Sequence, residues 1–158
     1  MPEVITMGHI LMDIQIVVDS FAQPDREGVV NSIKYGGGGS AANVAVGTSR
    51  LGIRSGYIGK VGMDSFGSTL LEEIRRDGVD VSRVKIDLDG STGFTIIIVN
   101  RVGQVIMYGF KGVSDKLMPN ELDTQYISSA EHLHITGLRL STAIKAAKIA
   151  KKAGVVVS

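Results

Sequence analysis

The stretch Tyr35–Gly52, YGGGGSAANVAVGTSRLG, decides the fold and poses the first question about the protein. Four consecutive glycines lead directly into a run of small residues that predicts a helix from Ser40 to Leu51. Glycine loses more backbone entropy on folding than any other residue, so four in a row need a reason. A strand, a glycine run and a helix in this order are typical of a loop whose free backbone N–H groups face an oxygen-rich ligand.

Two phosphate-binding motifs are weak candidates for this stretch. The segment 37–42 satisfies the G-x-G-x-x-A fingerprint of dinucleotide sites, but the next strand ends without the acidic residue that holds the ribose, and none follows before Asp64. A Walker-type loop needs a hydroxyl residue after its lysine, whereas Lys60 is followed by Val61. The dinucleotide-binding oxidoreductase stays open as a minor alternative, and the Walker loop is set aside.

A turn that binds sugar hydroxyls fits the stretch better because of Asn43. Its amide both donates and accepts hydrogen bonds, as a sugar hydroxyl does. The alternative without a ligand is that the glycines only allow close packing and that Asn43 caps the helix.

The segments on either side of this stretch alternate between strands and helices. Strands are predicted at 3–8, 54–62, 82–86 and 131–137, and helices at 64–78, 119–130 and 141–154. This alternation predicts an α/β fold, with a parallel sheet covered by helices. Two hairpins, at about 13–35 and 92–111, interrupt the alternation, and the second has an expected four-residue loop at 100–103. We expect them to form a small accessory sheet.

Composition excludes several classes of protein. The 158 residues include 17 basic and 16 acidic side chains, for a net charge of +1, so nothing favours nucleic acid or a membrane surface as partner. Cysteine is absent, which excludes disulfides and thiolate metal sites, and the three histidines form no recognisable metal set. No apolar run approaches the ~20 residues of a membrane span. We expect a cytoplasmic protein without a metal site, and the apolar segment at 155–158 predicts an α/β domain that is incomplete at its C-terminus.

Several motifs occur in order along the chain. GGSAANVA (38–45) and GKVGMDSFG (59–67) resemble the N-terminal signature of the ribokinase-like (PfkB) family of carbohydrate and nucleoside kinases. MGHILMDI (7–14) is similar to the family's first strand, and STGFTIIIVN (91–100) to its lid hairpin. The likeness covers residues 1–158.

The resemblance implies a three-layer αβα fold, with a mostly parallel sheet and a small β-sheet lid inserted at the two hairpins. It implies transfer of the ATP γ-phosphate, with Mg2+, to a hydroxymethyl group of a sugar or nucleoside. It also implies a homodimer formed through the lid.

The resemblance assigns substrate binding to six positions, namely Asp13, Gly38, Gly39, Asn43, Thr95 and Ile97. Asp13 would accept charge-assisted hydrogen bonds from sugar hydroxyls, and Asn43 would offer its amide. Thr95 and Ile97, on one face of a lid strand, would cover the sugar and exclude water. The first two glycines of the run would form the turn into the pocket, and the last two would present backbone N–H groups.

Three departures from the family pattern limit what the resemblance implies. Ribose-specific members carry Asn where this chain has Leu11 and Glu where it has Gly137, so ribose itself is a doubtful substrate. The family's Gly-Ala-Gly-Asp motif, which holds the catalytic base, does not occur in residues 1–158. No catalytic residue is therefore assigned, and we expect the 158-residue chain alone to be inactive. A non-catalytic binding or dimerisation module of the same fold remains the main alternative.

Overall fold

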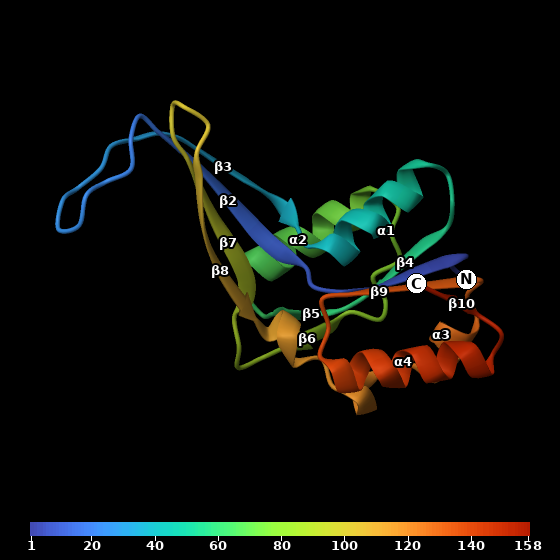
Figure 1. The fold of residues 1–158 in the computed structure, drawn as a ribbon. Coiled ribbons are helices and arrows are strands. Elements are labelled where there is room, and N and C mark those ends of the chain that lie inside the picture. The colour runs from blue at the N-terminus through green and yellow to red at the C-terminus, as the bar shows by residue number, and fades with distance from the viewer.

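A four-stranded parallel sheet forms the centre of the computed structural model, which describes residues 1–158 (Figure 1). Its strand order is β10 (Val156–Val157), β9 (His132–Thr136), β1 (Val4–Gly8) and β4 (Ser55–Ile58). β1 pairs in parallel with both β9 and β4. Strands in such a sheet are covered on both faces, which explains why they read as continuous apolar runs in the sequence.

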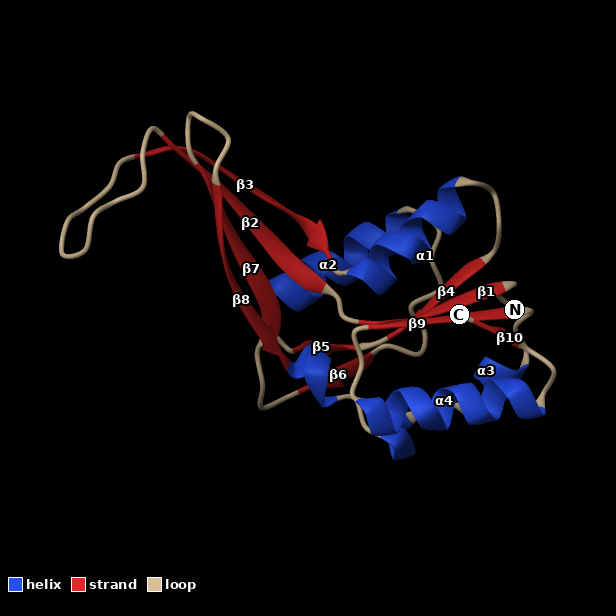
Figure 2. Cartoon of the chain, in the orientation of Figure 1, coloured by secondary structure: helices blue, strands red, loops and turns tan.

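Helices cover both faces of this sheet, as Figure 2 shows. α1 (Ser40–Arg50) and α2 (Ser65–Arg76) lie on one side, and α3 (Thr124–Ser128) and α4 (Leu140–Lys152) lie on the other. Each side has its own buried apolar cluster. The cluster beneath α1 includes three alanines of that helix, whose small side chains let the helix approach the sheet closely. The αβα layering expected from the sequence is present.

The two hairpins form one accessory sheet of four strands, which projects from one end of the core (Figure 1). Its order is β3 (Val30–Gly38), β2 (Leu11–Val18), β7 (Thr92–Val99) and β8 (Val105–Gly112). Each hairpin is antiparallel, and β2 and β7 join the two hairpins in parallel. The strands extend slightly beyond the ranges predicted from the sequence, and the second loop spans residues 100–104, one more than expected.

Three predicted elements were wrong in extent. The strand expected at 54–62 breaks at Gly59 into β4 and β5 (Lys60–Gly62), and β5 pairs with β6 (Lys85–Asp87) in a separate two-stranded sheet. β6 is shorter than the strand expected at 82–86 and begins three residues farther along the chain.

The helix expected at 119–130 is also two separate pieces. A short 3-10 helix (Pro119–Glu121) is followed by α3, and a 3-10 turn at Val113–Lys116 precedes both. Asp123 adopts an extended conformation and its carboxylate accepts from the N–H of Tyr126, so this residue caps a new helix instead of continuing the old one. None of the helices is long and apolar enough to cross a membrane.

Asp64 joins α2 to the start of the accessory sheet. Its carboxylate caps α2 by accepting from the N–H of Gly67, and it also accepts from the N–H and the hydroxyl of Thr92 at 2.7 Å each. The Thr92 hydroxyl in turn accepts from the N–H of Gly62. Burial opposes ionisation of Asp64, but these hydrogen bonds outweigh it and lower the pKa of the carboxyl. Asp64 therefore has a structural role at the start of α2.

Candidate functional site

The carboxylate of Asp13 lies directly against Gly38. A Cβ placed on Gly38 would come within 2.2 Å of Asp13 Oδ2, so only glycine leaves room for this carboxylate. Burial raises the pKa of Asp13, while the neighbouring Thr95 side chain partly opposes that rise. Asp13, Thr95 and Gly38 therefore form one contiguous group at the base of the accessory sheet.

Asp13 and Thr95 lie in the middle of one transverse row of this sheet. The strand register places Gly36, Asp13, Thr95 and Gly109 side by side across β3, β2, β7 and β8. No atom lies within 4 Å of the Cβ position of either outer glycine. We call the side of the sheet that carries these side chains the Asp13 face. Ile97 is on the same face, one row farther from the core.

The glycine run does not form the turn that the sequence predicted. Gly36 and Gly37 are part of β3, which continues through Gly38. The chain turns only at Gly39, whose φ of 101° is in the left-handed region and whose Cβ would lie 2.3 Å from the carbonyl oxygen of His9. Gly39 therefore lets α1 begin beside the end of β1.

The N-terminus of α1 has no side-chain cap. Gly39 is the N-cap residue, and the backbone N–H of Asn43 donates to its carbonyl at 2.9 Å. Asn43 is thus inside the first turn with an exposed side chain, and the alternative that it caps the helix is wrong. The first N–H groups of a helix have no partner within it, so they remain available to a ligand.

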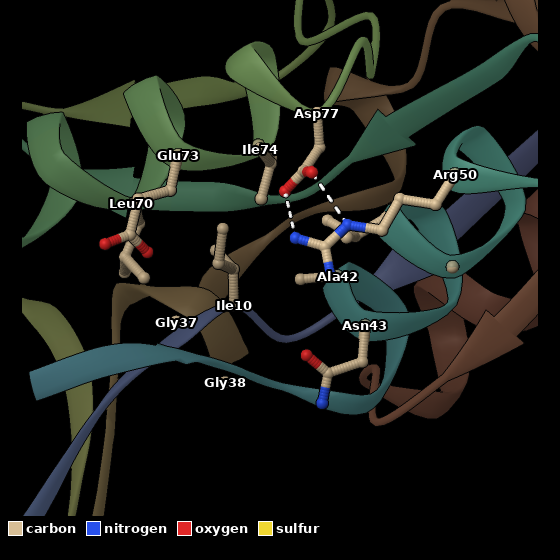
Figure 3. A pocket seen from close by; sticks show the side chains of 12 residues that line it. Ile10, Gly37, Gly38, Ala42, Asn43, Arg50, Leu70, Glu73, Ile74 and Asp77 are labelled. Atoms are coloured by element: carbon tan, nitrogen blue, oxygen red, sulfur yellow. Dashed lines mark hydrogen bonds and ion pairs between the residues drawn. The ribbon is translucent and has the colours of Figure 1, made fainter.

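A groove of about 340 Å³ runs between α1 and α2 beside the glycine run. Figure 3 shows Gly38 and Asn43 near one end and Arg50 at the other, where its guanidinium pairs with Asp77 at 2.7 Å. Asp13, Thr95 and Ile97 do not line this groove. Of the predicted site residues, the groove therefore contains Gly38 and Asn43, and it does not bring Asn43 together with Asp13 and Thr95.

A second group of polar side chains lies at the end of β1, and sequence reasoning had assigned it no role. Nε2 of His9 is buried and lies 3.4 Å from Oδ1 of Asp115, too poorly aligned to form a good hydrogen bond. Burial lowers the pKa of His9; Asp115 opposes this effect and Lys111, on β8, adds to it. Asp115 follows β8 closely in the chain, so the end of β8 that carries Lys111 is near the carboxyl end of β1. The only sequence signal of Lys111 is the alternation with Gly109, which places both on one face.

The other two histidines hydrogen-bond rather than forming a metal site. Nε2 of His132 and Nδ1 of His134 lie 2.8 Å and 3.0 Å from the hydroxyl oxygen of Ser158. They are two residues apart and lie on one side of β9. No group of three histidine or carboxylate side chains in residues 1–158 could hold a metal ion.

Comparison with known proteins establishes the family. The family described as pfkB family carbohydrate kinase matches residues 1–158. The chain belongs to this family. The glycine run also lacks the context of a dinucleotide site, because the strand before it lies in the accessory sheet and not in the parallel one.

Two curated relatives of this pfkB family chain are kinases of small sugars. An ATP-dependent ribose-1-phosphate kinase of Halopiger xanaduensis is 37% identical over 158 residues, which cover 100% of the chain and 53% of the relative. A 5-dehydro-2-deoxygluconokinase of Shouchella clausii is 33% identical over 161 residues, covering 96% of the chain and 48% of the relative. The chain thus spans about half the length of these relatives.

Solved structures support the ribokinase-like fold. An Arabidopsis thaliana ribokinase complexed with ribose and ATP superposes with a TM-score of 0.90 at 22% identity, covering 99% of the chain and 52% of that protein. A putative ribokinase II from E. coli, in its apo form, gives 0.84 at 26% identity, with 99% and 52% covered.

Proposed function

We propose that this chain is the substrate-binding half and the lid of a kinase that phosphorylates a hydroxymethyl group of a small sugar or nucleoside. The observation that carries the proposal is the meeting of three groups. The Asp13 carboxylate lies against Gly38, Thr95 is its neighbour in the strand register, and the uncapped start of α1 follows Gly38 and Gly39 along the chain.

Each of these groups suits a polyhydroxylated ligand. The Asp13 carboxylate accepts hydrogen bonds from hydroxyl groups, and such charge-assisted bonds are stronger than neutral ones. Backbone N–H groups at Gly38 and Gly39 donate hydrogen bonds to ligand oxygens. The Asn43 amide can both donate and accept hydrogen bonds. In this proposal these contacts fix the orientation of the hydroxymethyl group that is to react.

The accessory sheet acts as the lid. Thr95 and Ile97 project from its Asp13 face, and Ile97 adds apolar surface beside the polar row. A lid that excludes water suppresses transfer of the phosphoryl group to water instead of the sugar.

ATP and Mg2+ enter the proposal from the family and from the relatives named above. ATP would supply the transferred phosphoryl group. The described residues contain no cluster suited to a metal ion, so no step is assigned to Mg2+ within this chain.

The relatives' names suggest which sugars to test. Ribose-1-phosphate and the substrate named by 5-dehydro-2-deoxygluconokinase are both negatively charged, one through a phosphate and the other through a carboxylate. Leu11 stands where ribose-specific members carry a polar ligand, so we expect neutral ribose to be a poor substrate.

The test is an ADP-release assay on the full-length protein that contains residues 1–158. We expect ATP-dependent turnover of at least one of the two charged sugars, and slower turnover of ribose and nucleosides. Thermal-shift measurements with the same compounds and with NAD give an independent readout. Stabilisation by NAD, with no sugar or nucleoside turned over, would contradict the proposal.

We also propose that the protein forms a homodimer through the side of the accessory sheet opposite the Asp13 face. Two adjacent rows on this side are entirely apolar across the four strands, Tyr35–Ile14–Ile96–Tyr108 and Ile33–Ile16–Ile98–Ile106. Tyr35, Tyr108 and Ile33 are 63%, 62% and 49% exposed. An apolar surface of this kind is typical of a protein interface.

Charged substitutions on this apolar side should separate the subunits. We expect the wild-type protein to elute as a dimer in size-exclusion chromatography with light scattering. The double substitution Ile33→Asp with Tyr108→Asp should weaken dimerisation by at least ~100-fold, because each buries an unpaired charge at the interface. Met107→Asp, equally exposed but on the Asp13 face, is the control and should remain dimeric. A wild-type protein that is monomeric at every concentration would rule out the interface.

A further inference from the structure

The innermost row of the Asp13 face carries an unpaired cation. Continuing the register by one step toward the core places Gly38, Leu11, Gly93 and Lys111 across the four strands. The Cβ position of Gly93 lies 2.4 Å from Leu11 Cδ2 and 2.5 Å from the carbonyl oxygen of Lys111, which confirms that the three residues are neighbours. Lys111 is thus adjacent to the row of Asp13 and Thr95.

Lys111 lies at the core end of β8, four residues before Asp115, whose carboxylate is 3.4 Å from Nε2 of His9, the residue after β1. The charge of Lys111 adds to the lowering of the His9 pKa. The carboxyl ends of parallel strands are where α/β proteins bind their ligands. Lys111 therefore approaches the ligand position from β8, whereas Asp13 and Gly38 approach it from β2 and β3.

No acidic side chain neutralises Lys111. It makes no ion pair within 4 Å, and the nearby carboxylate of Asp115 faces His9 instead. Asp13 is the only acid among the paired residues of the Asp13 face, and its pKa responds to burial and to Thr95 but not to Lys111. A lysine at the edge of a binding site without a counter-charge favours an anionic ligand.

Lys34 offers a comparison on the same face. It is exposed and unpaired on β3, opposite Gln15, one row farther out than Asp13 and on the other edge of the sheet. Position, not charge alone, distinguishes the two lysines, because only Lys111 lies beside the end of β1.

We propose that the sugar bound by this site carries a phosphate or carboxylate, and that Lys111 binds that anionic group while Asp13 holds the hydroxyls. This inference rests on the proposed sugar kinase function and adds a specificity-determining residue to it. A phosphate and a carboxylate both require a cation at the base of the accessory sheet, and the two anionic groups differ from each other in geometry.

The test compares charged and neutral ligands in the full-length protein. KM from ADP release and Kd from calorimetry are measured for ribose-1-phosphate, 5-dehydro-2-deoxygluconate and ribose with wild type, Lys111→Ala, Lys111→Arg and Lys34→Ala. Loss of a charge-assisted contact corresponds to about 10- to 100-fold. We expect Lys111→Ala to weaken binding of its charged substrate by this factor and to change ribose binding less than ~2-fold. Lys111→Arg should restore most of the affinity, and Lys34→Ala should match wild type.

The outcomes separate this inference from the proposed function. Turnover of sugars with no preference for the charged ones, or equal losses in Lys111→Ala and Lys34→Ala, overturns the role of Lys111 and leaves the kinase proposal intact. Failure to bind or phosphorylate any sugar, charged or neutral, overturns both. Raising the salt concentration should reduce affinity for the charged sugar in wild type more than in Lys111→Ala, because screening acts on the ion pair.

Discussion

Asp13→Asn in the full-length protein should lower kcat/KM for the sugar by about 100- to 1000-fold, because two charge-assisted hydrogen bonds are weakened at once. The substitution keeps the shape of the side chain, so its contact with Gly38 is retained. Asp19→Asn, exposed and directly after the far end of β2, is the matched control and should stay within ~2-fold of wild type.

Stability distinguishes a binding role of Asp13 from a structural one. Burial raises its pKa in the folded state, so the ionised carboxylate disfavours folding at neutral pH. The wild-type protein should gain stability from this group as the pH falls through the raised pKa, and Asp13→Asn should lose that dependence. We therefore expect the variant to be at least as stable as wild type at pH 7 in urea unfolding. Activity and stability lost together would indicate a structural role instead.

Gly39→Ala should destabilise the fold by about 2–5 kcal/mol, since a side chain must adopt a strained positive φ and also displace backbone atoms. The added Cβ would lie 2.3 Å from the carbonyl oxygen of His9, in the backbone directly after β1. Urea unfolding of the full-length protein measures the change.

Gly47→Ala provides the control within the same helix. Gly47 has no atom within 4 Å of its Cβ position, and alanine favours helix over glycine by about 1 kcal/mol. The two glycine-to-alanine substitutions should therefore change stability in opposite directions. If Gly39→Ala were as stable as wild type, the start of α1 would have to be more adaptable than its geometry indicates.

Local sequence patterns predicted the layers of the fold because those layers follow from local chemistry. The small-residue helix after Gly39 and the apolar central strands are present as expected. The prediction of one helix at 119–130 was wrong because the Asp123 side chain caps a new helix. The spacing of apolar residues does not reveal this competition between capping a helix and continuing one. The prediction of one continuous strand at 54–62 was wrong because the chain passes from one sheet to another at Gly59.

The candidate site was harder to predict from the sequence than the fold. Individual residues such as Asp13 and Asn43 stand in motifs, but the pairing of β2 with β7 joins segments far apart in the chain, and no local pattern encodes that register. The row of Asp13 and Thr95 between two glycines therefore appears only in three dimensions. Lys111 belongs to no sequence motif, and only the strand register reveals that it lies one row from Asp13 and Thr95.

The hydrogen bonds between Asp64 and Thr92 anchor the base of β7, an inner strand of the accessory sheet. β7 is tied there to α2, whereas β3 and β8 meet the core at Gly39 and Gly112, whose φ values are 101° and 55°. Rotation of the sheet would therefore have its axis near Thr92 and its largest displacement at the outer loops. In the lid movement that we propose, torsion changes at Gly39 and Gly112 would let the sheet move while Thr92 keeps its hydrogen bonds to Asp64.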